Sequence, residues 1–149
     1  PLFVRSAAGK SVGWIRTQSI RMKAKVVFID YLQLIHQAGA KDRYSAVTEI
    51  SMELHEFAQS TGTLVVALAQ LNRETTRAGI PPTAADLRES GQIEQDADAI
   101  ILLAKNVTTK KRPEQHYHFA LEKNKEGNVG SLDITFQMET QQFKECVWM

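Results

Sequence analysis

The fold is decided by the stretch Val26-Val27-Phe28-Ile29-Asp30, in which four apolar residues precede an acid. A second apolar run, Leu64-Val65-Val66-Ala67-Leu68-Ala69, ends at Gln70. Runs that are apolar on both faces and rich in β-branched residues predict buried parallel strands. We therefore expect the two runs to be neighbouring strands of one sheet.

A helix is predicted between these strands, over residues 44–60. Gly62 follows its end, and its apolar face is expected to comprise Val47, Ile50, Met52, Leu54 and Phe57. Strand, helix and strand at this spacing indicate a βαβ unit with a right-handed crossover. Upstream, Ser11 is a candidate N-cap of an earlier helix, and Phe3-Val4 is the candidate end of an earlier strand.

The rear of the chain has a strand-rich pattern. A third core strand is predicted over Ala99-Ile100-Ile101-Leu102-Leu103. Two alternating stretches, 116–121 and 132–136, flank a loop rich in Lys, Gly and Asn and predict a β-hairpin with a long turn. Exposed loops are predicted over residues 105–112 and 71–86, and the second is long and polar enough to suggest a functional loop.

Composition excludes several classes of protein. A chain of 149 residues fits one domain with a core. It contains no run of ~18 apolar residues, which argues against a membrane span. It starts with Pro1 and shows no signal-peptide pattern, so we expect a fragment or a processed chain. The lone Cys146 precludes an internal disulfide and fits a reducing compartment. With a net charge of +1, any nucleic-acid contact must come from a local patch.

Polar side chains follow the first two predicted strands. In an open parallel sheet, ligands bind beyond the carboxyl ends of the strands, where Asp30 and Gln70 stand. Four hydrophobic residues followed by an acid form the Walker B pattern, whose carboxylate holds the magnesium that bridges nucleotide phosphates. Both residues also have a structural reading, since an Asp can start a turn and a Gln can cap a loop.

Four longer blocks begin at these residues or follow them in the chain: Asp30-Tyr31-Leu32-Gln33-Leu34, Gln70-Leu71-Asn72-Arg73, Asp86-Leu87-Arg88-Glu89-Ser90-Gly91 and Ile93-Glu94-Gln95-Asp96-Ala97-Asp98. In this order and spacing, from about Phe3 to Phe136, they resemble the DnaB-type replicative DNA helicases. The resemblance implies an α/β, RecA-like P-loop NTPase core with a largely parallel sheet, flanking helices and a C-terminal β-hairpin. It also implies ATP and Mg²⁺ as cofactors and 5′ to 3′ translocation on single-stranded DNA as a homo-hexamer. A primase and a helicase loader are the implied partners, in the cytoplasm of a bacterial or phage-infected cell.

The resemblance assigns roles to individual residues. Asp30 matches the acid of the magnesium site, and Gln70 matches the residue that senses the terminal phosphate of the nucleotide. Arg88, Glu89 and Gly91 match the loop that grips the phosphate backbone of single-stranded DNA. Without the flanking blocks, Arg88 and Glu89 would be read as a solvated ion pair on a helix.

The hairpin turn matches the family segment that reaches the nucleotide of the neighbouring subunit. Lys123 falls where the family has a lysine, and Lys125 falls where most members have the arginine finger. Lys125 is a departure, because lysine is a point charge without the bidentate fork of arginine. It is either a working substitute, since it can still neutralise charge on the γ-phosphate, or a weakened trigger.

Residues 1–149 are therefore expected to be a partial motor domain that runs from Walker B to the arginine-finger region. The stretch Ala8-Gly9-Lys10-Ser11 resembles the end of a phosphate-binding loop, but Val4 occupies the place of its first glycine. The resemblance places the Walker A segment, the catalytic glutamate and the collar domain upstream of this chain. We expect the isolated chain to have no ATPase activity.

Two other classes of function stay open. The same fold serves recombinases and regulatory ATPases that assemble on partners without unwinding DNA. The chain would alternatively be a passive DNA-binding or oligomerisation module. His116 and His118 share one face of a strand, but two histidines without a third ligand are weak evidence for a metal site.

Overall fold

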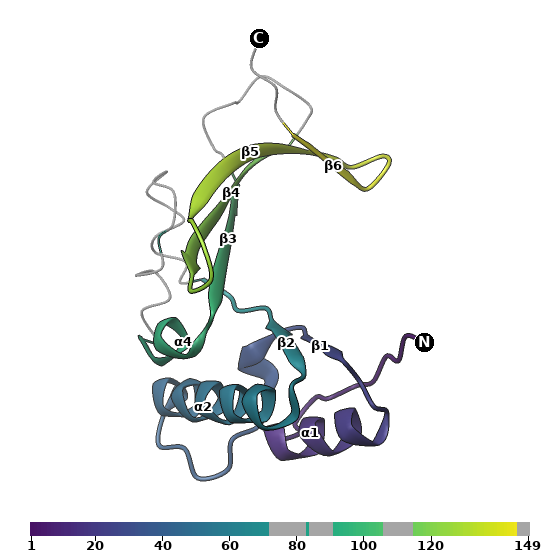
Figure 1. Cartoon of the computed structure of the whole chain (residues 1–149), viewed down its shortest axis with the longest axis vertical. Coiled ribbons are helices and arrows are strands. Elements are labelled where there is room, and N and C mark those ends of the chain that lie inside the picture. Colours follow the sequence, from purple (N-terminus) through teal and green to yellow (C-terminus); the bar gives the residue numbers. More distant parts are fainter. Residues whose placement is uncertain (72–82, 84–90, 106–114, 146–149) are drawn as a thin grey trace. The chain divides into compact units, whose positions relative to one another are not determined.

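The computed structural model describes residues 1–71, 83, 91–105 and 115–145 (Figure 1). The chain divides into two compact units, Pro1–Gln70 with Glu89–Asp96, and Leu71–Arg88 with Ala97–Met149. We call them unit 1 and unit 2. Unit 1 contains α1 (Val12–Arg21), β1 (Val26–Ile29), the 3-10 helix η1 (Leu32–Leu34), α2 (Arg43–Thr61), β2 (Leu64–Ala67) and α4 (Gly91–Asp96). Unit 2 contains β3 (Ala99–Lys105), β4 (Gln115–Asn124), β5 (Gly130–Gln137) and β6 (Gln142–Glu145).

The predicted βαβ unit is confirmed in unit 1. β1 and β2 pair in parallel, from Val26 opposite Leu64 to Ile29 opposite Ala67, and α2 connects them. The helix begins after the N-cap Asp42 and ends at Gly62, whose φ of 64° lies in the left-handed region that glycine enters without strain. These local signals explain why its predicted bounds differ from the observed bounds by only one residue at each end.

The core of unit 1 lies on one side of the β1–β2 pair, where α1 and α2 pack (Figure 1). The buried side chains of α2 recur at helical spacing: Val47, Ile50, Leu54 and Phe57. Met52 was predicted to belong to this face, and that prediction is wrong, because Met52 is 53% exposed. Its position is off the i, i+3, i+7, i+10 stripe that the other four occupy. The predicted N-cap Ser11 is confirmed, since its hydroxyl accepts a hydrogen bond from the N–H of Trp14.

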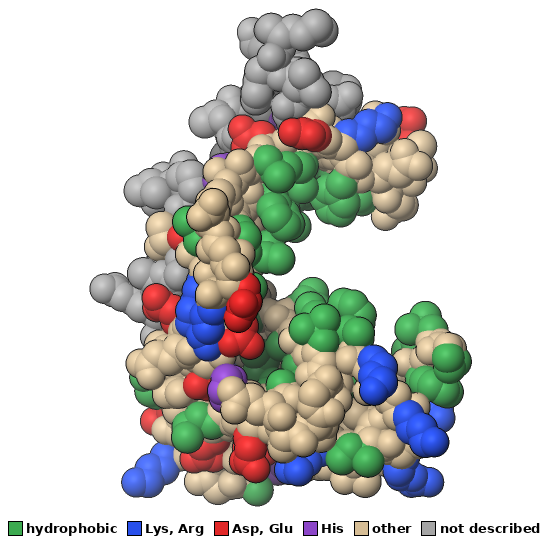
Figure 2. All heavy atoms as spheres, viewed as in Figure 1, with side chains coloured by type: hydrophobic (Ala, Val, Ile, Leu, Met, Phe, Trp, Pro, Cys, Tyr) green, Lys and Arg blue, Asp and Glu red, His purple; other side chains and the backbone are tan. Residues whose placement is uncertain are grey.

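The opposite face of β1 and β2 is apolar and exposed. Phe28 is 71% exposed and Leu64 is 59% exposed, and Val26 and Val66 complete the four-residue patch in register with them. Figure 2 shows apolar side chains at the surface of unit 1. The prediction that both faces of these strands are buried is wrong within unit 1, because no described element of this unit covers this side.

Unit 2 is an antiparallel sheet in the order β3-β4-β5-β6. The predicted third strand and the predicted hairpin are confirmed as β3 and as β4–β5, joined through residues 125–129. The strands extend further than predicted, so the turn is shorter. Of the described strands only β1 and β2 run parallel, and β6 had no sequence prediction. The predicted loops over 105–112 and 71–86 lie almost wholly outside the described residues.

Two further sequence expectations concern the ends of the fold and its relation to membranes. The predicted strand at Phe3-Val4 is absent from the structure, because these residues are exposed and pair with no described strand. None of the helices in the described part of the chain is long and apolar enough to cross a membrane.

The N-cap of α2 predicts a loss of stability in acid. The N–H of Ser45 donates to Oδ1 of Asp42 at 2.7 Å, and this bond holds the pKa of Asp42 below its ordinary value of 3.8. Because the pKa is lower in the folded state, the stabilising contribution is complete above 3.8 and is lost as the pH falls through the folded value. We expect Asp42→Ala to lower the melting temperature at about pH 7 and to lose this effect in acid.

Asp42→Asn is the matched control, because asparagine caps a helix without titrating. It should melt near the wild type at neutral pH and should lack the acid-dependent part of the change. Circular dichroism melts of the three proteins across the acid range provide the measurement. An Asp42→Ala deficit that persists undiminished at the lowest pH would contradict the assignment.

Candidate functional site

Asp30 and Gln70 lie at the same edge of the β1–β2 pair. The main chain continues to pair beyond the strands, because the N–H of Leu68 donates to the carbonyl of Ile29 at 2.9 Å and the N–H of Leu32 donates to the carbonyl of Leu68 at 2.8 Å. Asp30 sits between these two bonds, is exposed, and is joined to Tyr31 by a cis peptide bond. The buried neighbour Ile29 anchors the strand end in the core, so the position of Asp30 is fixed by packing.

Gln33 fixes the position of the main chain at Gln70. Its side-chain Nε2 donates to the carbonyl of Gln70 at 3.3 Å, and its Oε1 accepts from the N–H of Gln70 at 3.3 Å. This two-point contact leaves the side chain of Gln70 exposed at the edge. Sequence reasoning gave Gln33 no role, although a polar residue between two leucines at a strand exit was a signal for one.

The edge fits one part of a magnesium–nucleotide site. In the described residues, no three His, Cys, Asp or Glu side chains gather into a metal-binding cluster. Mg²⁺ bound with a nucleotide needs fewer protein ligands, because phosphate oxygens and water complete its shell. A single exposed carboxylate at a strand end, as Asp30 provides, suits that coordination.

The stretch Ala8-Gly9-Lys10-Ser11 is used locally at the start of α1. The N–H of Lys10 donates to the carbonyl of Ala7 at 3.0 Å, and the Ser11 hydroxyl caps the helix. A phosphate-binding loop connects a strand to a helix, and residues 1–7 form no strand. The geometry thus supports the sequence reading of this stretch as a loop and cap.

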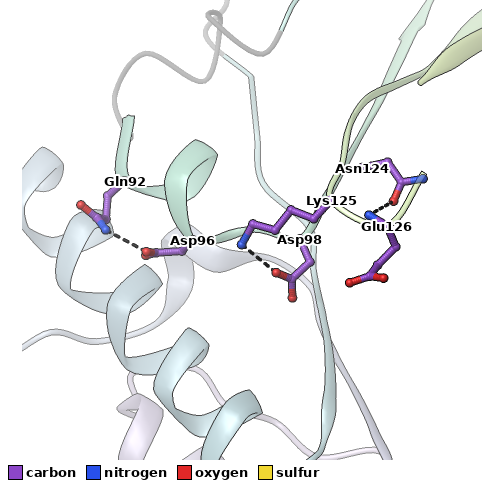
Figure 3. A network of polar contacts seen from close by, with 6 residues as sticks. All are labelled: Gln92, Asp96, Asp98, Asn124, Lys125 and Glu126. Carbon is purple, nitrogen blue, oxygen red and sulfur yellow. Dashed lines mark hydrogen bonds and ion pairs between the residues drawn. The ribbon is translucent and has the colours of Figure 1, made fainter. Parts of the chain in front are cut away.

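Lys125 is held at the start of the β4–β5 turn by Asp98. Its Nζ donates to Oδ1 of Asp98 at 2.8 Å, and its main-chain N–H donates to the carbonyl of Asp98 at 2.9 Å (Figure 3). Lys123 lies two residues earlier, at the end of β4, where it pairs with Ile100 of β3. Asp98 ends the last of the four helicase-like blocks, but no local pattern around it predicts a contact with Lys125.

The turn itself is ordered by Asn124. Its Oδ1 accepts from the N–H of Glu126 at 3.2 Å (Figure 3). Its Nδ2 donates to the carbonyl of Asn128 at 3.3 Å. A Cβ at Gly127 would come within 3.2 Å of that Nδ2, so glycine leaves room for the bond. Lys125 therefore projects from a turn whose backbone is fixed by side-chain contacts.

The candidate DNA-binding residues are only partly described. Arg88 and Glu89 lie outside the described residues, and Gly91 is exposed at the first position of α4. The helix that Gly91 begins is fixed to α2, since Ser51 donates to Oδ2 of Asp96 at 2.7 Å and Gln92 donates to Oδ1 of Asp96 at 2.8 Å. Figure 3 includes the bond between Gln92 and Asp96.

The two histidines of β4 have a structural setting. His118 Nδ1 lies 2.9 Å from Oδ1 of Asp133 on β5, and His116 is buried on the same face. Each histidine is opposite a β5 residue in the strand register, with His118 facing Asp133 and His116 facing Thr135. The contact connects neighbouring strands, as cross-strand polar pairs do.

Comparison with known proteins identifies a family and several relatives. The family model described as "DnaB-like helicase C terminal domain" matches residues 1–145. A "Probable plasmid replicative DNA helicase" of Chlamydia muridarum is 36% identical over 129 residues, which cover 85% of this chain and 28% of that protein. The "Replicative DNA helicase DnaC" of Bacillus subtilis is 35% identical over an alignment that covers 95% of this chain and 33% of that protein. The chain thus spans about a third or less of these relatives.

Solved structures agree with the sequence matches. A structure described as "The Structure Of A DnaB-Like Replicative Helicase And Its Interactions With Primase" is 34% identical with a TM-score of 0.83, covering 95% of this chain and 36% of that chain. A second structure, described as an "ATPase Domain", is 32% identical with a TM-score of 0.83, and the match covers 94% of this chain and 53% of that chain. The fold is therefore that of RecA-like helicase ATPase domains. With the family model matching nearly all of its length, the chain belongs to the DnaB-like helicase C-terminal domain family.

Proposed function

We propose that this chain is the rear part of the motor of an ATP-driven replicative DNA helicase. The parent would move 5′ to 3′ along single-stranded DNA as a homo-hexamer and would separate the duplex ahead of it. The observation that carries this proposal is the parallel β1–β2 pair, which brings Asp30 and Gln70 to one edge, where Gln33 bonds to the main chain of Gln70. In α/β sheets this edge is where ligands bind.

The nucleotide end of the proposed motor uses two side chains of unit 1. Asp30 would support Mg²⁺, which when bound neutralises charge on the β- and γ-phosphates of ATP. Gln70 would form a hydrogen bond with the terminal phosphate. Because Gln33 is bonded to the main chain of Gln70, a movement of Gln70 would be passed on to the exit of β1. The exposed positions of Asp30 and Gln70 support these roles, because a ligand can reach both.

The exposed apolar face of unit 1 supports a partial motor domain. Phe28 and Leu64 lie more than half exposed on strands of a kind that helices cover on both sides in α/β proteins. We propose that residues 1–149 form the segment from Walker B to the arginine-finger region. The Walker A segment and the collar domain would belong to other parts of the helicase, and the isolated chain would not hydrolyse ATP.

Unit 2 would supply a cation to the neighbouring subunit. Lys125, on the ordered turn, would act in the place of the arginine finger, and Lys123 lies two residues before it at the end of β4. Two lysines at one hairpin end can offset charge that develops on the γ-phosphate during its transfer. The bond to Asp98 holds one of these charges at a defined position.

Single-stranded DNA would bind through Arg88, Glu89 and Gly91. One arginine per subunit gives a phosphate contact, and glycine allows close approach of the backbone. The attachment of α4 to α2 through Asp96 and Ser51 supports this proposal, because it gives the loop a fixed end. A primase and a helicase loader are the proposed protein partners, in the cytoplasm of a bacterial or phage-infected cell.

Arg88→Ala is expected to weaken the binding of single-stranded DNA by the full-length helicase. Each lost phosphate contact should reduce the slope of log affinity against log salt by about 0.7. Fluorescence anisotropy with a labelled oligonucleotide over a series of salt concentrations measures this slope. Arg21→Ala is the matched control, since Arg21 lies in the last turn of α1, away from the candidate loop in sequence. An unchanged slope for Arg88→Ala would exclude the phosphate contact.

The function as a whole is tested by unwinding of a forked duplex by the full-length helicase. We expect strand separation that requires ATP, Mg²⁺ and a 5′ single-stranded tail. ATP-dependent assembly on DNA without strand separation would instead favour a recombinase or a regulatory ATPase. DNA binding that is indifferent to ATP would favour a passive binding module.

A further inference from the structure

The lysine at the finger position lacks a property that an arginine there would have. The guanidinium group is planar and preorganised, whereas the ammonium group of Lys125 ends a flexible four-carbon stem. A finger must hold its charge in place, because the stabilisation of developing charge depends on preorganisation. A lysine that replaces it therefore needs an external restraint.

Asp98 provides two contacts to Lys125. The carboxylate accepts from Nζ at 2.8 Å, and the carbonyl of the same residue accepts from the main-chain N–H at 2.9 Å. Both ends of the lysine are thus bonded to one residue, as Figure 3 shows for the side chain. The side chain of Lys125 is 41% exposed and that of Asp98 is 74% exposed, so solvent reaches the ammonium group.

We propose that Asp98 is a positioning residue that fixes the ammonium of Lys125 for its contact with the phosphate in the neighbouring subunit. The proposal rests on the proposed finger role of Lys125. An ammonium group has three N–H donors, and one bond to Asp98 leaves two for phosphate oxygens. Asp98 would act through its contacts with Lys125 and not by binding the nucleotide itself.

Main-chain contacts hold this part of the hairpin independently of the carboxylate. Ala99 pairs with Asn124 in the β3–β4 ladder, and the main-chain bond from Lys125 to Asp98 persists whatever side chain stands at position 98. Asn124 holds the rest of the turn. Asp98→Asn should therefore change where the ammonium lies and leave the hairpin folded.

The restraint is measured directly in the 149-residue chain by NMR of the lysine ammonium groups. We expect the order parameter of the Lys125 ammonium to exceed that of the exposed Lys41 and to fall to the level of Lys41 in Asp98→Asn. Glu126→Gln is the matched control, because it removes a neighbouring charge from the same turn without touching the bond to Asp98. Equal order in the wild type and in Asp98→Asn overturns the proposal.

The functional consequence is measured by ATP turnover of the full-length helicase. Asp98→Asn should lower kcat about fivefold, as expected for the loss of an exposed ion pair, and should leave KM for ATP unchanged. In a Lys125→Arg background the same substitution should lower kcat by a smaller factor, because the guanidinium of arginine is itself rigid and planar. Glu126→Gln should leave kcat unchanged in both backgrounds.

The outcomes separate the proposal from the function on which it rests. If Lys125→Ala slows turnover but Asp98→Asn does not, the finger stands and the positioning role is overturned. If neither substitution slows turnover, the finger role fails and the positioning role fails with it. If Asp98→Asn lowers kcat by the same factor in the Lys125→Arg background as in the wild type, Asp98 does not act through Lys125, and the proposal is again overturned.

Discussion

Replacing Asp30 with alanine in the helicase that carries this chain is expected to lower ATP hydrolysis about 10³-fold. In the proposed site this carboxylate would hold Mg²⁺, and without it the charge on the β- and γ-phosphates would be less well compensated in the transition state. Asp30 is exposed and its neighbour Ile29 carries the packing, so the variant should fold as the wild type does. Steady-state release of phosphate in the presence of single-stranded DNA measures the effect.

Glu56→Ala is the matched control for Asp30→Ala. Glu56 is an exposed carboxylate in the same unit, 4.0 Å from Arg16, and an exposed pair of this kind contributes little to stability. The control should retain full turnover. Excess Mg²⁺ should rescue Asp30→Ala only weakly, because the ligand itself is missing. Turnover of Asp30→Ala within a factor of a few of the wild type would remove Asp30 from the magnesium site.

The sequence predicted the strand edge that carries Asp30 and Gln70 because its signals are local. An apolar β-branched run, an acid at its end and a helix with a cap and a terminal glycine all depend on residues close together in the chain. The parallel register then follows from the short βαβ connection, which brings Asp30 and Gln70 to one edge. The same reasoning located α2 to within one residue at each end.

The contact between Asp98 and Lys125 could not be predicted in this way. It joins residues 27 positions apart and depends on the register of β3 against β4, which shifts between Ile100 and Ile101. A one-residue slip in such a ladder moves every side chain to the other face. Acidic and basic residues are common around both strands, so the sequence alone could not select this pair.

The exposure of Phe28 and Leu64 shows a different limit of prediction from sequence. Apolar residues on both faces of a strand indicate a strand that is buried on both sides, and β1 and β2 have this pattern. Among the described elements of unit 1, α1, α2 and η1 all lie on one side of the pair and cover that face. The sequence thus predicted burial on both faces, and unit 1 supplies the packing on one of them.

Lys125→Ala is expected to leave ATP binding unchanged and to slow turnover by about 10³-fold, the lower end of the range for an arginine finger. A lower value than for arginine is reasonable, because lysine offers a point charge without the fork. Binding of a fluorescent ATP analogue and steady-state turnover give the two quantities. Lys41→Ala, an exposed lysine in unit 1, is the control and should change neither. Unchanged turnover of Lys125→Ala would show that its finger role is wrong.

Mixing two inactive variants tests whether Lys125 acts on the neighbouring subunit. In a mixed ring, an interface that combines Asp30 of a Lys125→Ala subunit with Lys125 of an Asp30→Ala subunit contains both groups intact. We expect such rings to recover measurable hydrolysis, although each variant alone has about 10³-fold less than the wild type. A cation that acted within its own subunit would give no recovery, because no subunit of the mixture would carry both residues. Recovery would therefore place the Lys125 turn across a subunit interface, with Asp30 and Lys125 serving one nucleotide from opposite sides.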